Sequence, residues 1–274
     1  MSQSEISSNN SAFWNELCGS QLAESLGVRD SSASSLAIFD RWYFDIYPYL
    51  ADHIPFDALK GKDVLEVGLG YGSVAQRLME SGANYHGLDI AAGPVWMANH
   101  RMQQCGVSGQ VSQGSILEPP YSPASFDAIV AIGCLHHTGN LEMSIEQCHR
   151  LLRQGGRLIF MVYYAYSYRR LRTIPKATLK YMVKELMGYR GVIGHSEEGE
   201  RAAYDTNSQG NSAPHTDWIS IRSLKKLCSS FSRFDARLEN IDQEPPFSKT
   251  PRVQLLKTRW PTLLGLDLYA TAVK

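Results

Sequence analysis

The sequence has little of what marks a secreted or membrane-embedded chain. Its five cysteines are scattered and form no CxxC pair, so neither a disulfide framework nor a cysteine-built metal site is expected. The polar first ten residues contain no apolar signal region, and the longest near-apolar run, 158–165, is far shorter than the roughly 20 residues that span a bilayer. We therefore expect a soluble, cytoplasmic protein.

The sequence also lacks net charge. Among its 274 residues, 27 Lys and Arg balance 27 Asp and Glu. This balance argues against bulk electrostatic attraction to nucleic acid or to an anionic membrane, although it is compatible with a local basic patch. Since 43% of the residues are hydrophobic and 20% are charged, the composition is typical of a folded globular chain.

Strand and helix patterns alternate through the middle of the chain. Short apolar runs predict strands at 63–67, 84–89, 109–113, 126–132 and 157–163. Helical spacing follows a glycine-rich turn at 68–72 and returns in two further segments, 94–105 and 141–152. Because this alternation implies βαβ units, we expect an α/β fold with a mostly parallel sheet and helices on both of its faces.

The remaining segments are assigned around this core, and no internal repeat divides them. We expect one domain rather than two, with a polar, Ser-rich tail before it. The divisions are a disordered tail over 1–12, an aromatic-rich helical cover over 13–59, a core over 60–164, an insertion covering the substrate over 165–218, and a C-terminal helix and strands over 219–274.

The most informative segment is the glycine turn with the acid that follows it. Glu66 precedes Gly68, Gly70 and Gly72, and closely spaced glycines let the backbone approach a bound molecule. Asp89 ends the next strand about 20 residues later, where a carboxylate can accept hydrogen bonds from ribose hydroxyls. The alternatives are a plain tight turn and a helix N-cap. The glycine spacing is E-x-G-x-G-x-G, with Ser at 73, and differs from a dinucleotide fingerprint.

These residues resemble a known family over about 60–165. VLEVGLGYG, YHGLDI, FDAIVAIGCLHHTGN and LLRQGGRLIFMVYY occur in the order found in class I S-adenosylmethionine-dependent methyltransferases. FWNELCGS is similar to an N-terminal segment of bacterial small-molecule members, with Leu17 where Pro is usual. The resemblance implies a Rossmann-like sheet of seven strands with the last strand antiparallel. It also implies S-adenosyl-L-methionine as the cofactor.

The resemblance further implies where this cofactor lies. Glu66, Gly68 and Gly70 of the glycine turn belong beside its methionine end, and Asp89 beside its ribose. Ile90 can pack on the adenine face. The remaining expected cofactor contacts are Ser115 and Ile116 near the adenine, where many relatives carry Asp in place of Ser115, and Ile132 and Gly133 near the sulfonium.

Candidate catalytic residues follow the fourth strand. His136 and His137 leave that strand directly, and a neutral imidazole suits proton removal at neutral pH. His215, in a later polar loop, is a third candidate. Local packing of the histidine pair is the alternative interpretation. No third ligand has recognisable spacing beside the pair, so no metal site is expected.

Candidate substrate residues lie at the fifth strand and in the insertion. Tyr163 and Tyr164 leave the end of that strand, and Tyr204 and Asp217 lie in the polar loop. Ordinary aromatic packing and helix capping are the alternatives. The segment 169–190 is basic with helical apolar spacing, which fits the solvated face of a lid helix, a site for an acidic substrate, or contact with a membrane surface.

The features together favour methyl transfer to a small-molecule acceptor, with O- or N-methylation by in-line displacement. Nucleic acid is not expected as a partner, because no basic groove with interleaved aromatics is present. Membrane contact is not the favoured expectation. An NAD(P)-dependent oxidoreductase and a non-catalytic partner subunit on the same fold are the rival interpretations. The acceptor and the oligomeric state stay open.

Overall fold

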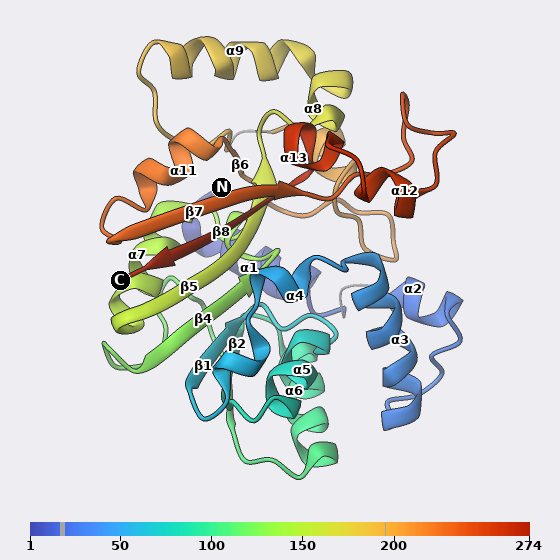
Figure 1. Cartoon of the computed structure of the whole chain (residues 1–274), viewed down its shortest axis with the longest axis vertical. Coiled ribbons are helices and arrows are strands. Elements are labelled where there is room, and N and C mark those ends of the chain that lie inside the picture. The colour runs from blue at the N-terminus through green and yellow to red at the C-terminus, as the bar shows by residue number, and fades with distance from the viewer. Residues whose placement is uncertain (17–19, 195) are drawn as a thin grey trace.

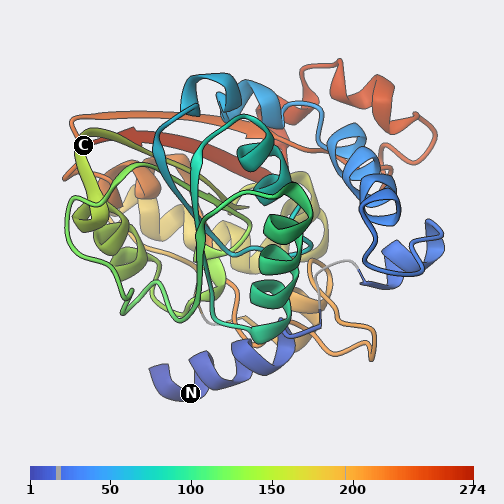
Figure 2. The ribbon, with the colours of Figure 1, turned by 90° about the horizontal axis from the view of Figure 1, so that it is seen from below.

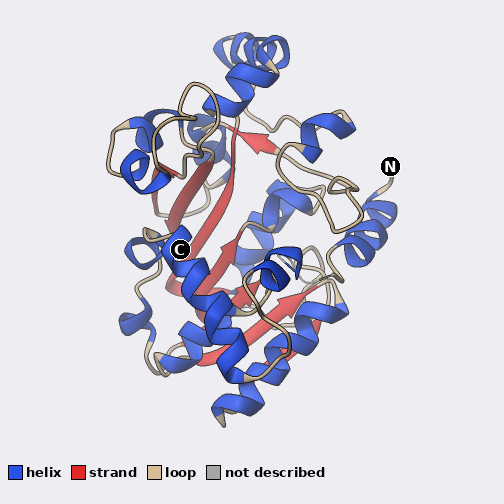
Figure 3. Ribbon diagram, turned by 90° about the vertical axis from the view of Figure 1, so that its right-hand side faces the viewer, coloured by secondary structure: helices blue, strands red, loops and turns tan. Residues whose placement is uncertain are grey.

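The chain forms a central sheet with helices packed on both faces (Figures 1 and 3). The structure is a computed structural model and describes residues 1–16, 20–194 and 196–274. Leu17, in the segment FWNELCGS, lies outside the described residues.

Seven strands of one mixed sheet follow the order β3-β2-β1-β4-β5-β8-β7, and a short eighth strand of two residues pairs with β5. β1 to β5 are mutually parallel, and β8 runs antiparallel to both β5 and β7. The prediction of a seven-stranded, mostly parallel Rossmann-like sheet with an antiparallel last strand is confirmed. The bounds are β1 (Asp63–Val67), β2 (Asn84–Asp89), β3 (Gln110–Gln113), β4 (Phe126–Ile132), β5 (Leu152–Tyr164), β7 (Arg233–Glu239) and β8 (Asp267–Val273).

Neighbouring residues of the central strands point to opposite faces of the sheet. Leu65 and Ile129 join the core cluster that contains α7 (Leu141–Leu151) and α11 (Ile221–Leu227). Val64 and Val130 join the other cluster, which contains α5 (Ser73–Glu80) and α6 (Ala92–Cys105). Because successive strand side chains alternate, apolar residues at every position predict a strand buried on both faces. This burial keeps the sheet, and so the ends of its strands, in a fixed position.

β5 begins earlier than its glycines suggest. The predicted strand starts at residue 157, after a helix stopped by Gly155 and Gly156, whereas β5 already pairs with β4 at Leu152. A register shift between Phe126 and Ala128 accommodates the extra residues, and Gly155 has φ of 78°. The glycines therefore make an irregularity within the strand pairing rather than a separate turn.

The expected disordered tail over 1–12 is wrong, because α1 (Gln3–Phe13) occupies it. Ser2 caps this helix and exchanges hydrogen bonds with Glu5 in a capping box. Ile6 and Asn10 are buried against the rest of the domain. Figure 2 shows α1 along the side of the molecule opposite to β7 and β8. The prediction of disorder was based on polar composition. A capped helix can stay in place when only one stripe of its residues is buried.

The remaining helices lie outside the sheet core. The aromatic segment after α1 forms α2 (Ser20–Ser25), α3 (Ala33–Ile46), α4 (Leu50–His53) and the 3₁₀ turn η1 (Phe56–Leu59). A second 3₁₀ turn, η2 (Leu135–His137), follows β4. The insertion contains α8 (Tyr168–Thr173), α9 (Pro175–Leu186), α10 (Glu198–Ala202) and β6 (Trp218–Ile219), which pairs with β5; α12 (Arg252–Leu256) and α13 (Trp260–Leu264) precede β8. In the described part of the chain no helix has the length and apolar character to cross a bilayer.

A buried arginine ties the N-terminal cover to the core. Arg101 of α6 is 1% exposed and donates to both carboxylate oxygens of Asp40 on α3, at 2.8 and 2.9 Å. Its Nε also donates to the Tyr71 carbonyl in the glycine turn at 3.0 Å. One guanidinium therefore joins α3, α6 and the turn, and its planar fork suits this two-pronged contact.

We expect Arg101→Ala to lower the free energy of unfolding by about 3 kcal/mol, because it strands the Asp40 carboxylate without its partner. Urea unfolding monitored by circular dichroism measures this change. Arg233→Ala is the matched control, since the Arg233–Asp235 pair is exposed and should contribute less than about 1 kcal/mol. Equal effects of the two substitutions would contradict the role given to Arg101.

Candidate functional site

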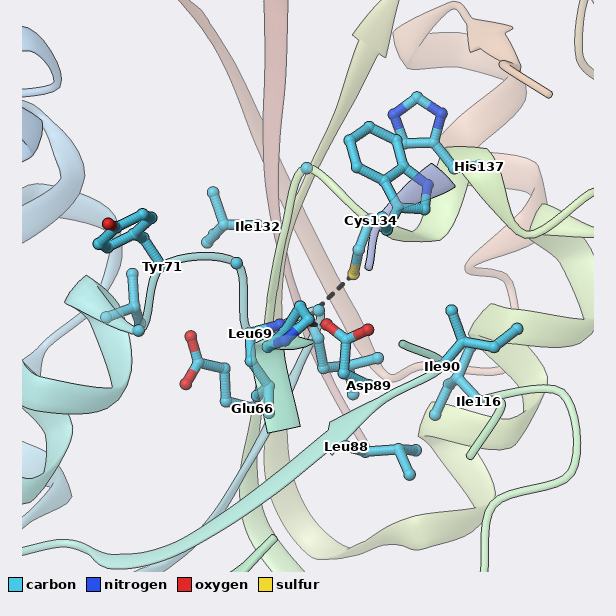
Figure 4. Close-up of a pocket in the computed structure, with 18 of the residues that line it drawn as sticks. Glu66, Leu69, Tyr71, Leu88, Asp89, Ile90, Ile116, Ile132, Cys134 and His137 are labelled. Carbon is cyan, nitrogen blue, oxygen red and sulfur yellow. Dashed lines mark hydrogen bonds between the residues drawn. The ribbon is translucent and has the colours of Figure 1, made fainter. Parts of the chain in front are cut away.

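A cavity of about 200 Å³ lies at the carboxyl ends of β1, β2 and β4 (Figure 4). The strand order reverses between β1 and β4, and ligands of open α/β sheets bind at such a switch point. All ten residues predicted for the cofactor line this one cavity: Glu66, Gly68, Gly70, Gly72, Asp89, Ile90, Ser115, Ile116, Ile132 and Gly133. The structure thus gathers residues from 66 to 133 around one hollow.

The glycine turn passes close to the exit of β4. Gly68 has φ of 78°, and a Cβ there would lie 2.4 Å from the Cβ of Cys134. The Cys134 thiol donates to the Val67 carbonyl at 2.9 Å, which holds the two segments together. Only glycine combines this backbone conformation with so close an approach. The turn therefore presents bare backbone to the cavity.

Asp89 contacts the glycine turn directly at the edge of the cavity. One carboxylate oxygen accepts the Leu69 backbone N–H at 2.7 Å and the other accepts that of Ala91 at 2.9 Å. Burial raises the pKa of Asp89 to about 6 against the opposing effect of these backbone hydrogen bonds. Each oxygen keeps acceptor capacity for a hydroxyl group. The N-cap alternative is wrong, because the N-cap of α6 is Ala91.

Glu66 lies at the base of the cavity with little access to water. Its side chain accepts a hydrogen bond from the Tyr85 hydroxyl at 2.7 Å. Burial raises the pKa of Glu66 to about 8, although the Tyr85 hydrogen bond opposes this. The carboxyl group is therefore mostly protonated at neutral pH, and a cation brought next to it favours ionisation.

Apolar side chains form two walls beside these carboxyl groups. Figure 4 shows Ile90 and Ile116 together on one side of Asp89, with Tyr71 and Ile132 on the other side of the glycine turn. A slot between aliphatic side chains accepts a flat apolar ring, and the carboxylate next to it accepts hydroxyl groups. The cavity thus has the chemistry needed to hold a nucleoside.

The N-terminal helix closes the cavity, which the sequence reasoning missed. Asn10 donates to the His137 carbonyl at 2.6 Å, and Ser11 donates to the Ile90 carbonyl at 3.0 Å. The Trp14 ring lies 4.9 Å from the ring of His137. The capping box at Ser2 and Glu5 is the sequence signal that predicts this helix.

Part of the aromatic cover on α3 also borders the cavity. Phe39 stacks on Tyr71 at 4.3 Å, and both residues line the cavity with Tyr43. Phe39 is at the same time buried in a small core cluster. Phe39 therefore both packs in a core cluster and covers part of the cavity.

Among the three candidate catalytic histidines, only His137 lines the cavity. Its Nδ1 donates to the His215 carbonyl at 2.7 Å, and its Nε2 lies 3.6 Å from an Asp205 oxygen. His136 is fully buried beside Tyr163, and burial lowers its pKa well below the usual range. His215 points away and pairs with Asp217 at 3.0 Å. The geometry therefore does not support His136 or His215 as a base at this cavity.

The four candidate substrate residues lie behind His137 rather than in the cavity. The Tyr163 hydroxyl donates to Asp205 at 3.0 Å, and Tyr204 packs against the Tyr163 ring at 4.7 Å. Tyr164 packs against the core cluster, and Asp217 holds the His215 side chain. None of the described residues of 165–218 lines the cavity. The prediction that the insertion covers it is therefore wrong, and α1 and α3 cover it instead. The reason is that the insertion packs over the end of β5.

Asp205 is a site residue that only the tertiary structure identifies. It comes from the loop after α10 and is partly buried between Tyr163 and His137. Burial raises its pKa, and the neighbouring His137 opposes this. Among the described residues no three His, Cys, Asp or Glu side chains are grouped as metal ligands.

Comparisons with known proteins agree with this geometry. Residues 65–160 match the model of a methyltransferase domain. The chain is 30% identical over 118 residues to a ubiquinone biosynthesis O-methyltransferase of Pseudomonas aeruginosa, covering 42% of this chain and 50% of that protein. It is 30% identical over 100 residues to a demethylmenaquinone methyltransferase of Tropheryma whipplei, covering 36% and 41%. The chain thus spans half or less of the length of these curated relatives.

Solved structures share the fold over more of the chain. An S-adenosylmethionine-dependent methyltransferase from Mesorhizobium loti superposes with a TM-score of 0.55 at 16% identity, covering 83% of this chain and 97% of that one. A methyltransferase from Methanosarcina mazei gives 0.52 at 13% identity, covering 83% and 97%. At these identities the likeness shows the fold alone. Residues 65–160 thus match a methyltransferase domain, and the chain shares its fold with S-adenosylmethionine-dependent methyltransferases.

Proposed function

We propose that this protein transfers a methyl group from S-adenosylmethionine to a small-molecule acceptor. The observation that carries the proposal is the position of Asp89 beside the glycine turn, where both line a cavity at the switch point of the sheet. A carboxylate for ribose hydroxyls beside bare backbone is what an adenosine-containing ligand requires. The family of the domain at 65–160 supports the same conclusion.

The residues fit the cofactor from end to end. In the proposed complex Asp89 accepts the ribose hydroxyls, and Ile90 and Ile116 hold the adenine between aliphatic side chains. Gly68 and Gly70 leave room for the methionine end, which places its ammonium group near Glu66. Ser115, Ile132 and Gly133 complete the contacts proposed above. The cofactor, when bound, supplies the electrophilic methyl group.

The acceptor is proposed to approach from the side of α1 and α3. Trp14, Tyr43 and His137 line that part of the cavity, and aromatic faces suit a planar organic acceptor. One matched relative carries O-methyltransferase in its name, which favours an oxygen acceptor. The protein then contributes mainly by positioning, because in-line displacement requires donor and acceptor to be held in one alignment.

His137 is the residue we propose as general base. Its Nδ1–H is held by the His215 carbonyl, so the lone pair lies on Nε2, which has no hydrogen-bond partner in the described structure. A proton taken from the acceptor onto Nε2 makes an imidazolium. The Asp205 carboxylate at 3.6 Å stabilises that charge.

We expect wild-type protein to bind S-adenosylmethionine and S-adenosylhomocysteine in titration calorimetry. Asp89→Ala should raise the Kd by about 100-fold, because two charge-assisted hydrogen bonds are lost. Asp235→Ala, which changes an exposed carboxylate on β7, should leave the Kd unchanged. If neither ligand binds wild type, the enzyme proposal fails and the partner-subunit interpretation gains support.

The same binding should weaken at acid pH. The ionised form of Asp89 accepts the ribose hydroxyls, and the pKa of Asp89 in the free protein is about 6. Affinity should therefore fall as pH drops below about 6, by at most about tenfold per pH unit for one proton. Asp89→Ala should not show this decrease in affinity below pH 6. If the variant still shows it, another group causes the decrease.

Cofactor binding should also release a proton near neutral pH. The pKa of Glu66 is about 8 in the free protein, and a cationic ligand next to it lowers that pKa. The binding heat at pH 7.5 should therefore differ between Tris and phosphate buffers, which have different ionisation enthalpies. Glu66→Gln should remove most of this difference; an unchanged buffer dependence would show that the proton comes from elsewhere.

The base is tested on the acceptor identified by transfer of labelled methyl groups into metabolite extracts. His137→Gln should lower kcat by about 100-fold or more with cofactor affinity retained, and Asp205→Asn should lower it less. His215→Ala is the matched control, because only the backbone carbonyl of that residue holds His137. Undiminished turnover and an unchanged pH profile in His137→Gln would remove His137 from the mechanism.

A further inference from the structure

Helix α9 buries three residues with polar groups against the protein and exposes its apolar stripe to water. Thr178, Tyr181 and Glu185, spaced by three and four residues, are its buried positions. The outer face carries five exposed apolar side chains, and Leu186 and Met187 are 75% and 83% exposed. Helices of soluble domains usually bury their apolar stripe. The exposed apolar side chains are Leu179, Met182, Val183, Leu186 and Met187.

The orientation of α9 is fixed by contacts on its inner side. Glu185 accepts hydrogen bonds from the Tyr166 hydroxyl and the Ser223 hydroxyl, each at 2.8 Å, and from the Ser220 hydroxyl. The Tyr181 hydroxyl donates to the Ser223 hydroxyl at 3.2 Å. Rolling the helix to bury its apolar stripe would leave this carboxylate without partners, which is costly. The apolar face in water is therefore a built-in feature of the fold.

The same outer face is basic. Lys176, Lys180 and Lys184 form a row at intervals of four residues along one flank of the apolar stripe, and all three are exposed. Glu185 is the only acidic residue within α9, and it points inward. We call the apolar stripe and this lysine row the α9 outer face. It combines apolar surface with unbalanced positive charge, in a chain whose net charge is zero.

Apart from the Tyr189 ring, 5.8 Å from the Lys184 ammonium group, no described residue is recorded against the side chains of this face. Figure 1 shows α9 along one extremity of the molecule, with α8 beside it and the sheet on its inner side only. Figure 3, turned by a right angle, shows α9 end-on at the same extremity. A flat surface can therefore reach α9 without meeting another element first.

We propose that the α9 outer face docks on the surface of an anionic phospholipid bilayer. The apolar stripe enters the boundary between headgroups and acyl chains, and the lysine row reaches the lipid phosphates. A second copy of this chain fits the face less well, because it would bring two lysine rows together without an acidic partner from either α9. Docking is peripheral, and it is independent of the proposed methyl transfer.

The test uses the full chain with sedimenting vesicles of phosphatidylcholine alone or with phosphatidylglycerol. Binding should require phosphatidylglycerol and decrease with added salt. Lys180→Glu/Lys184→Glu should lower the partition coefficient at least about tenfold. Lys60→Glu/Lys62→Glu is the matched control, because it changes the net charge equally at exposed positions beside β1 and should bind like wild type.

A second variant separates the apolar contribution from charge. Leu186→Ser/Met187→Ser keeps every lysine and should also weaken vesicle binding, with far-UV circular dichroism and thermal unfolding unchanged because both side chains are exposed. Absence of binding to anionic vesicles, or binding that neither α9 variant weakens, would overturn the proposal. A wild-type dimer in light scattering that this variant dissociates would assign the face to a second copy instead.

Discussion

The arrangement of the whole site depends on one buried carboxylate. Asp89 lies between the backbone N–H groups of Leu69 and Ala91, and so connects the glycine turn after β1 to the start of α6 after β2. These hydrogen bonds favour the charged form, whereas burial disfavours it, and burial is the larger effect because the pKa of Asp89 is raised to about 6. A hydroxyl-bearing ligand restores part of the solvation that the carboxylate lost on folding.

Around this contact, the strand ends, the N-terminal helices and the insertion each have a different part in the site. The carboxyl ends of the parallel strands supply the residues proposed to bind the cofactor, and α1 and α3 close the cavity over them. The insertion lies behind His137. Its His215 carbonyl accepts a hydrogen bond from His137 Nδ1, and its Asp205 carboxylate lies 3.6 Å from His137 Nε2. Such a supporting layer orients an imidazole without occupying the space that a substrate needs. The same insertion turns α9 outward on the far side.

The predictable part of the site is the part that depends on local sequence. Gly68, Gly70 and Asp89 have fixed positions relative to strand ends, and parallel strands bring their ends to one edge of a sheet, so spacing alone places them together. His137 and His136 are adjacent, yet one faces the cavity and the other is fully buried. That difference depends on the direction of the 3₁₀ turn η2 and on which neighbours pack there. The position of Asp205 could not be predicted from local sequence, because it depends on how the long insertion packs beside Tyr163 and His137.

The sequence by itself determined the mostly parallel α/β sheet, the glycine turn and its acidic partner, because apolar periodicity and turn residues act over short distances. Tertiary structure alone decided that the N-terminal segment is a closing helix, that His137 is the cavity-facing histidine, and that the apolar side of α9 faces water. Each of these outcomes depends on which side chains become buried when distant segments of the chain pack together. The polar contacts of Glu185 with Ser220 and Ser223 decide that competition at α9, and no pattern within the helix itself contains those partners.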